Sequence, residues 1–363
     1  MTTEHSHRHA VILAGGRGTR LWPISTAKQP KQFQALGDSR SLIAQTFDRL
    51  ASVVGDERIF VSTTAGYVDD VIAALPRLSR ENLIVEPRPE GKPAAFLLIA
   101  NRIYSKDPLA VVFSAAADSS VSPLSVFQES CAGAFQFVES YPFWTTILGV
   151  RPTRADSSLG YIRARGAAMG VKGIYVARDF EEKPTRESTE SLVAKPDYFW
   201  NSSHYCFSVS TLLEAYKQAA PELFAAVDSY NRTELEAEYE SKDAPGHELL
   251  PLINGGWPIG VMACDFRWYD IGTWPSLYRA LQDSQGTKLI TSGAHIDLES
   301  DGGLVVNDSS MTVVTAGLND LAVIVSNSVV LVAPIRKLED QPDTIAYLQS
   351  KYAGLADQRE KTK

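Results

Sequence analysis

The chain has 363 residues, of which 44% are hydrophobic and 21% are charged. This composition is typical of a globular protein and argues against a largely disordered chain. The length predicts about two domains. The formal net charge of −8 argues against a general nucleic-acid-binding or membrane-surface protein, because both of those partners select a basic surface. We therefore expect no nucleic-acid partner and no membrane partner.

The cysteines and the N-terminal segment favour a cytoplasmic protein. Cys131, Cys206 and Cys264 are widely spaced and form no CxxC pair, as expected in a reducing compartment. No apolar stretch reaches the ~20 residues of a membrane span. The apolar run that starts at Ala10 is too short for the core of a signal peptide. Residues 1–9 contain three histidines that would suit a metal ion, but we interpret this polar segment as a disordered tail.

The first half of the chain alternates short apolar runs with helical periodicity. Buried strands are predicted at 10–14, 58–63, 83–85, 109–113 and 145–150. Helices are predicted at 41–54, 93–104 and 122–141. This alternation is typical of a mostly parallel sheet covered by helices on both faces. Ligands of such sheets bind beyond the carboxyl ends of the strands, so the loops there are the candidate sites.

The pattern changes along the second half of the chain. A strand at 173–180 and a helix at 210–219 precede a charged stretch that we interpret as a solvated helix face or loop. The β-prone runs that follow are 289–296, 302–307, 311–315, 321–326 and 328–334. They predict a small β-rich domain over 286–340, for which a left-handed β-helix is one architecture, although no strict hexapeptide register is present. Residues 341–363 are predicted to form a terminal helix and tail.

The loop after the first predicted strand carries the strongest chemical signal. Gly15, Gly16 and Gly18 allow backbone N–H groups to approach an anion closely. Four cations follow within fifteen residues: Arg17, Arg20, Lys28 and Lys31. This is a local electropositive site suited to phosphates, although it is neither a Walker A loop nor a complete dinucleotide fingerprint. For the glycines alone, a tight turn with solvated arginines is an equally good interpretation.

The complete string is more specific than its glycines. GGRGTRLWP followed by PKQF resembles the signature loop of the sugar-nucleotide pyrophosphorylases, and its LWP and PKQF elements resemble the mannose-1-phosphate guanylyltransferase branch. The resemblance runs from about Ala10 to Pro334. It implies a Rossmann-like α/β nucleotidyltransferase domain over 10–285, with a mixed, mostly parallel sheet. It also implies a GTP-binding, magnesium-dependent transferase of GDP-mannose biosynthesis.

The implied reaction joins mannose 1-phosphate, or a related hexose 1-phosphate, to the GMP group of GTP and releases pyrophosphate. Its nucleophile is already an anion, so catalysis should rest on positioning, cations and Mg²⁺. The resemblance implies catalytic roles for Arg20, Lys31, Asp118 and Asp270, with the two aspartates as metal ligands. Asp118 follows a predicted strand, where capping of the next helix is the alternative role. Asp270 lies in WYDIGTW, which matches the family closely.

Further short motifs supply the implied substrate contacts. The nucleotide contacts are Leu13, Ala14, Gly15, Gly16, Gly18, Thr19 and Glu86. The sugar-phosphate contacts are Gly160 in a GYI element, Glu182 and Lys183 in FEEKP, and Asn201 in WNSS. Each of these strings alone would suit a turn, a surface ion pair or a core tryptophan. Their order and spacing support the resemblance.

Two departures from the family pattern leave the specificity open. The RNTAP run expected near the nucleotide is replaced by EGKPA at 90–94, and the glycine of the family's WNSG element is Ser203. The same chemistry with another nucleoside triphosphate or sugar phosphate is therefore one alternative. A catalytically silent homologue that binds a nucleotide sugar and regulates a partner is another. The chain is also a candidate homo-oligomer.

Overall fold

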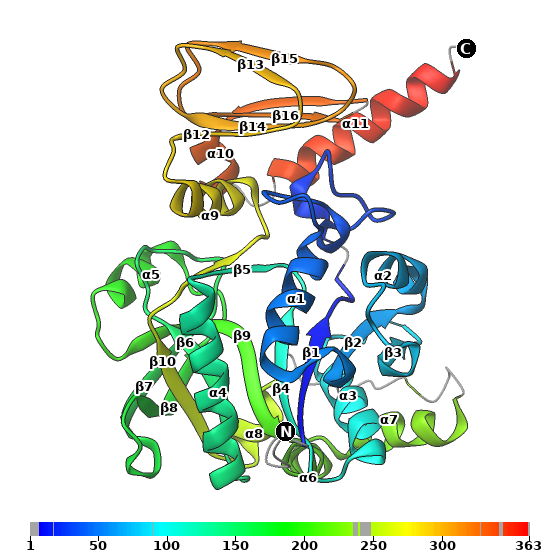
Figure 1. Cartoon of the computed structure of the whole chain (residues 1–363), viewed down its shortest axis with the longest axis vertical. Coiled ribbons are helices and arrows are strands. Elements are labelled where there is room, and N and C mark those ends of the chain that lie inside the picture. The colour runs from blue at the N-terminus through cyan, green and yellow to red at the C-terminus, as the bar shows by residue number, and fades with distance from the viewer. Residues whose placement is uncertain are drawn as a thin grey trace. The chain divides into compact units, whose positions relative to one another are not determined.

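The computed structural model describes residues 7–16, 18–88, 90–234, 239, 248–326, 328–340 and 344–361, which form two compact units (Figure 1). Unit 1 comprises Met1–Gly15, Thr46–Ala117 and Val121–Trp268. Unit 2 comprises Gly16–Gln45, Asp118–Ser120 and Tyr269–Lys363. Each predicted domain is one continuous stretch of the chain, whereas each of these units is made of three separate segments. The candidate phosphate loop from Gly16 onward and both candidate metal ligands belong to the C-terminal unit.

Unit 1 is built on a nine-stranded sheet with the order β3-β2-β1-β4-β9-β6-β10-β8-β7. Its strands are β1 (Arg8–Leu13), β2 (Ile59–Thr64), β3 (Leu83–Glu86), β4 (Val111–Ala116), β6 (Thr145–Val150), β7 (Tyr161–Ala167), β8 (Ile174–Glu181), β9 (Tyr198–Ser208) and β10 (Ile259–Cys264). The first four are mutually parallel, β6 is parallel to β10, and β9 is antiparallel to both β4 and β6. The predicted α/β fold with a mixed sheet is confirmed.

Helices cover both faces of this sheet. The side chain of Phe113 on β4 packs against Phe127 and Phe135 of α4 (Leu124–Ser140). Its neighbour Val112 belongs to the core formed with α3 (Lys92–Lys106), α6 (Val209–Ala219) and α7 (Pro221–Thr233). Adjacent residues of a strand point to opposite faces, so α4 lies on one face and the other three helices lie on the other.

The other helices that contribute to unit 1 are shorter or are shared with unit 2. They are α1 (Leu42–Val54), α2 (Val68–Ala74), α5 (Arg186–Val193) and α8 (Leu250–Asn254). The predicted apolar face of α1 is confirmed, because Leu42, Phe47, Leu50 and Val54 are all buried. None of the described helices is long and apolar enough to cross a membrane. The three cysteines are free and buried.

Unit 2 contains a stack of short parallel strands that alternate between two sheets. The first sheet holds β12 (Leu289–Ser292), β14 (Gly303–Asp308), β16 (Leu321–Ser326) and β17 (Val330–Pro334), and the second holds β13 (His295–Leu298) and β15 (Val313–Ala316). All neighbours are parallel except β16 and β17. The predicted single run 289–296 is in fact two strands separated by Gly293. The β-rich C-terminal region is confirmed, and its left-handed coiling stays a prediction.

One apolar core joins the glycine-rich segment to these strands. Leu21, Ile24 and Leu36 lie in the same buried cluster as Leu304 and Ile324. The cluster also includes residues of α9 (Trp274–Gln285), α10 (Ile335–Asp340) and α11 (Thr344–Lys361). The candidate phosphate loop is therefore supported by the C-terminal part of the chain and is not independent of it.

The start of the chain differs from the prediction. Arg8 and His9 belong to β1, so the predicted tail, which was expected to run to residue 9, ends before Arg8. The Asp107 carboxylate accepts hydrogen bonds from the His7 and His9 rings at 2.9 and 3.1 Å. This pairing explains why a polar segment with histidines is ordered there. The remaining tail residues 1–6, with His5, lie outside the described part of the chain.

Truncation after Gln285 tests whether unit 2 depends on its C-terminal strands. The truncated protein loses Leu304, Ala322 and Ile324 from the core around Leu21, and each large apolar side chain contributes about 1.5–3 kcal/mol on burial. We expect unit 2 to lose its cooperative unfolding transition in calorimetry. A truncated chain that keeps every transition of the full-length protein would contradict the shared core.

Candidate active site

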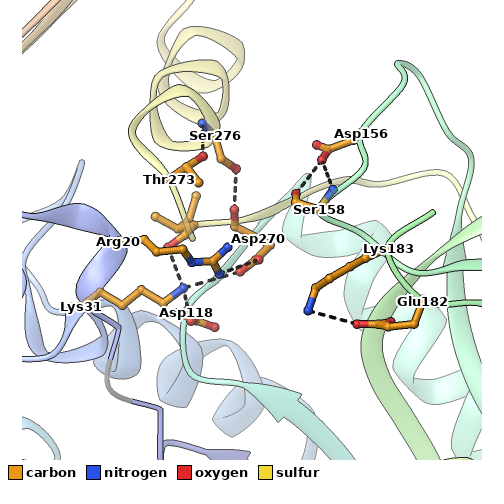
Figure 2. Close-up of polar contacts among 11 residues, drawn as sticks. Arg20, Lys31, Asp118, Asp156, Ser158, Glu182, Lys183, Asp270, Thr273 and Ser276 are labelled. Carbon is orange, nitrogen blue, oxygen red and sulfur yellow. Dashed lines mark hydrogen bonds and ion pairs between the residues drawn. The ribbon is translucent and has the colours of Figure 1, made fainter. Parts of the chain in front are cut away.

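Two carboxylates and two cations meet in unit 2 (Figure 2). The Lys31 Nζ atom lies 2.5 Å from Asp118 Oδ2 and 3.7 Å from Asp270 Oδ1. The Arg20 Nη2 atom lies 4.0 Å from Asp270 Oδ2. All four residues predicted to be catalytic are therefore brought together, from three segments that lie far apart in the sequence.

Lys31 is the buried centre of this cluster. Its side chain is 7% exposed, compared with 48% for Arg20. Burial by itself lowers the pKa of an ammonium group, but the charges of Asp118 and Asp270 outweigh burial and raise the pKa of Lys31. Lys31 is therefore a permanent cation at neutral pH. It also donates a hydrogen bond to the Ile271 carbonyl at 3.0 Å.

Local backbone contacts hold the two aspartates in place. The Asp118 carbonyl accepts a hydrogen bond from the Ile271 N–H at 3.0 Å. Asp270 ends β11 (Arg267–Asp270), and its carbonyl accepts a hydrogen bond from the Ser276 hydroxyl at the start of α9. Thr273 caps the same helix by accepting from the Ser276 N–H (Figure 2).

The alternative role for Asp118 as a helix cap is wrong. Asp118 is followed by a short strand, β5 (Ser119–Ser122), which the sequence pattern did not predict. The next helix, α4, is preceded by Pro123 in the N-cap position, and no side chain caps it. The Asp118 carboxylate is instead directed to Lys31.

The loop between Gly16 and Leu21 is held by side chains from two other segments. Gly18 has a left-handed backbone (φ 55°) and begins the short helix Thr19–Leu21. The buried Gln32 amide donates to the Gly16 carbonyl at 2.9 Å, and the Gln349 amide of α11 donates to the Thr19 carbonyl at 3.1 Å. Arg17, one of the four predicted cations, lies outside the described residues.

The carboxylate pair fits a divalent cation. The ammonium group of Lys31 lies near both Asp118 and Asp270, and the two aspartates supply the oxygen ligands that Mg²⁺ prefers. Among the described residues, no group of three or more acidic, histidine or cysteine side chains forms a metal site. Two carboxylates with the remaining positions left to water and phosphate oxygens are a usual magnesium site.

The predicted nucleotide contacts Leu13, Ala14, Gly15 and Glu86 lie in unit 1. Glu86 is the last residue of β3 and is buried, and its carboxylate accepts a hydrogen bond from the Ser62 hydroxyl at 3.0 Å. Burial raises the pKa of Glu86 to about 7, with the Ser62 hydrogen bond opposing the shift. Gly15 is its neighbour, since a Cβ atom at Gly15 would lie 3.5 Å from the Glu86 carboxylate. Gly16, Gly18 and Thr19 belong to unit 2.

The four predicted sugar-phosphate contacts also lie together in unit 1. The Asn201 N–H donates to the Gly160 carbonyl at 2.8 Å. A Cβ atom at Gly160 would lie 2.8 Å from the Glu182 carboxylate. The Lys183 Nζ atom lies 3.3 Å from Glu182 Oε1 (Figure 2). Glu182 and Lys183 are exposed, whereas Asn201 is buried and its amide donates to the Tyr205 hydroxyl at 2.9 Å.

Ser203 explains one departure from the family pattern. It stands where the WNSG element has glycine, and its backbone is left-handed (φ 57°), a conformation that favours glycine. The Asn201 side chain accepts a hydrogen bond from the Ser203 N–H at 3.0 Å. The serine therefore adopts the left-handed backbone that the family's glycine suggests, within strand β9, and the Asn201 side chain holds it in place.

Comparison with known proteins places the chain in a family. The sequence profile of the nucleotidyl transferase family matches residues 9–286. The chain belongs to this family. The chain is 27% identical to a mannose-1-phosphate guanylyltransferase of Escherichia coli over 93% of its own length and 75% of the relative's. It is 26% identical to the alginate biosynthesis protein AlgA of Pseudomonas aeruginosa over 91% of its length and 70% of the relative's.

A solved structure agrees with this membership. The mannose-1-phosphate geranyltransferase of Thermus thermophilus has a TM-score of 0.82 to this chain and is 25% identical, with 94% of this chain and 99% of that one covered. The predicted recognition is confirmed: the chain is a mannose-1-phosphate guanylyltransferase-like sugar-phosphate nucleotidyltransferase. The family acts on a nucleoside triphosphate and a sugar 1-phosphate.

Three residues of the site were not predicted from the sequence. Gln32 lies in the recognised PKQF string but had no assigned role. No sequence pattern pointed to Gln349, because its contact with Thr19 joins residues 330 positions apart. Gly272 lies in the WYDIGTW string, and an added Cβ atom there would lie 2.8 Å from Arg20 Nη2 and 3.0 Å from Asp270 Oδ2. Only a glycine allows these two side chains their present approach.

Gly272→Ala tests this close approach. We expect the nucleotidyl transfer rate to fall about tenfold or more, because the methyl group forces the Arg20 guanidinium away from Asp270. Gly66→Ala is a matched control, since a Cβ atom there meets nothing within 4 Å. Unfolding temperatures of both variants should stay near that of the wild type. A Gly272→Ala protein with an unchanged rate would show that the Arg20 position does not matter.

Proposed function

We propose that the protein forms GDP-mannose, or a related GDP-sugar, and pyrophosphate from GTP and a hexose 1-phosphate, with mannose 1-phosphate favoured. Relatives named mannose-1-phosphate guanylyltransferase support the choice of guanine nucleotide and mannose. The observation that carries the chemistry is the cluster of Lys31 and Arg20 with Asp118 and Asp270, a pair of cations beside a pair of carboxylates. Cytoplasmic location and a homo-oligomer stay predictions.

The reaction requires charge stabilisation more than proton transfer. A phosphate oxygen of the sugar 1-phosphate, already ionised at neutral pH, forms a bond to the α-phosphorus of GTP. The bond from that phosphorus to the bridging oxygen of the β-phosphate breaks, and pyrophosphate leaves with its electron pair. No general base is needed. Arg20 and Lys31 would bind phosphate oxygens and compensate the charge that develops in the transition state.

Magnesium would be held by Asp118 and Asp270 together with phosphate oxygens of the nucleotide. When bound, it neutralises phosphate charge and orients the polyphosphate for in-line transfer. The carboxylates therefore serve to place a cation beside the phosphates. Their position in the same unit as Gly16, Gly18 and Thr19 supports this assignment, because those residues belong to the predicted phosphate loop.

The two groups of residues in unit 1 would recognise the rest of the substrates. Glu86 beside Gly15 offers a buried carboxylate, which is suited to accept hydrogen bonds from the ring N–H and amino group of guanine. Glu182 offers a carboxylate for sugar hydroxyls, and its neighbour Lys183 offers an ammonium for the sugar phosphate. Lys183 has a left-handed backbone (φ 48°), an unfavourable conformation of the kind that clusters at binding sites.

An activity matrix tests the proposal directly. Purified protein with Mg²⁺ is incubated with each pair of a nucleoside triphosphate and a hexose 1-phosphate, and pyrophosphate release is measured. We expect the highest kcat/KM with GTP and mannose 1-phosphate. Asp118→Asn and Asp270→Asn should each lower it by about 100-fold or more, since a lost metal ligand costs several kcal/mol in the transition state.

The matrix also separates the alternatives. Highest activity with another nucleotide would keep the chemistry and change the substrate. Tight binding of a nucleotide sugar in calorimetry, without turnover of any pair by a folded protein, would indicate the catalytically silent regulatory homologue. Normal activity of either asparagine variant would remove that aspartate from the metal site.

The pH profile tests the role of Glu86. Its pKa of about 7 means that the carboxylate form, which accepts hydrogen bonds, becomes populated as the pH rises through 7. We expect kcat/KM for GTP to rise up to about tenfold per unit below pH 7 and to level off above it. Glu86→Gln should lower the preference for GTP and remove this part of the profile. The phosphates of both substrates titrate in the same pH range. If Glu86→Gln has the same pH profile as the wild type, the pH dependence comes from these phosphates and not from Glu86.

A further inference from the structure

The Lys31 ammonium faces three acceptors within its own cluster, two at hydrogen-bond distance and one as a longer ion pair. They are Asp118 Oδ2 at 2.5 Å, Asp270 Oδ1 at 3.7 Å and the Ile271 carbonyl at 3.0 Å. An ammonium group has three N–H bonds and no acceptor. While Lys31 stays in this position, two of its donors are therefore engaged within the cluster and its charge is directed at the two carboxylates.

This position is also the one that a divalent cation would take. A cation held by Asp118 and Asp270 would contact the same carboxylate oxygens that now face Lys31 Nζ. Metal–oxygen distances of about 2.0–2.1 Å for Mg²⁺ leave no room for an ammonium group between the same two oxygens. Lys31 and the metal ion are thus alternative occupants.

The charges of the cluster favour the ammonium in the absence of substrate. The two carboxylates are balanced by Lys31 and Arg20, so the cluster is neutral as it stands. Adding a divalent cation to it would place two excess positive charges at a partly buried site, which is unfavourable. The negative charge of a nucleoside triphosphate would compensate this excess, so that the divalent cation and the Lys31 ammonium can both be present at the site.

We propose that the Lys31 ammonium occupies the metal position between Asp118 and Asp270 in the ligand-free protein, and that the divalent cation displaces it when it enters with the polyphosphate. This exchange rests on the proposed function for the identity of the arriving anion. Lys31 is then released to bind a phosphate oxygen at the moment when one arrives.

The surroundings of Lys31 suit such a movement. Its aliphatic stem lies against Gly18 of the predicted phosphate loop, where a Cβ atom would lie 2.6 Å from Lys31 Cγ. The stem therefore lies beside that loop, and the exchange would carry the ammonium from the carboxylates toward it by rotation about the side-chain bonds. The exchange keeps the carboxylates paired with a cation at every stage, so they are never left buried and unpaired.

Titration with Mn²⁺ alone, followed by electron paramagnetic resonance, tests the exchange. Lys31→Met keeps the stem and removes the charge, so nothing competes with the metal ion. We expect Lys31→Met to bind Mn²⁺ about tenfold more tightly than the wild type, or better, in the absence of nucleotide. Lys288→Met, in the same unit at a 75% exposed lysine, should bind Mn²⁺ as the wild type does.

A second measurement covers the effect of the substitution on folding. Without Lys31, the like charges of Asp118 and Asp270 repel one another, so Mn²⁺ should raise the unfolding temperature of Lys31→Met more than that of the wild type. Equal or weaker Mn²⁺ binding by Lys31→Met, or no binding by either protein, would overturn the proposal. The titration contains no nucleotide or sugar, so a failure of the proposed reaction would appear only in the activity matrix.

Discussion

The buried ion pair between Lys31 and the two aspartates is the interaction on which the site depends. It joins the segment after the glycine-rich loop, the two residues that follow β4, and the end of β11. Each of these segments would otherwise carry an isolated charge, and an isolated charge at a buried position is costly. Together with Arg20 they form a neutral cluster, which matches the arrangement that the proposed reaction requires.

This cluster requires the apolar core of unit 2 beneath it. Leu21 and Ile271 follow Arg20 and Asp270 directly in the sequence, and both are buried in the core that also holds Leu304 and Ile324 of the C-terminal strands. The C-terminal region therefore has a role in the site although it contributes no chemical group to the cluster. Its last helix adds a direct contact, from Gln349 to the Thr19 carbonyl.

Much of the fold was predictable because its strands and helices are locally regular. The buried run at β6 and the apolar face of α1 follow from periodicity alone. The strand β9 was missed because its centre, Asn201 to His204, is polar. These groups are accommodated by partners that no local pattern reveals: the Ser202 hydroxyl donates to the Leu148 carbonyl and also shares a hydrogen bond with the buried His204 ring.

The four residues proposed to be catalytic were predictable as a group only because the resemblance supplied their pairing. Periodicity placed Asp118 after a strand but left its role open between a metal ligand and a helix cap. The association of residues 16–45 with the C-terminal unit was not predictable, since it depends on one apolar core that brings together residues more than 250 positions apart, such as Leu21 and Leu304. The details that permit the close approach, Gly272 and Gln349, follow only from three-dimensional geometry.

A crystal structure of the protein with Mn²⁺ and a non-hydrolysable GTP analogue tests the central claim most directly. The anomalous signal of the metal should lie between Asp118 and Asp270, and the Lys31 ammonium should lie on a phosphate oxygen instead of between the carboxylates. A metal ion bound elsewhere, with Lys31 still between the two aspartates, would contradict the account.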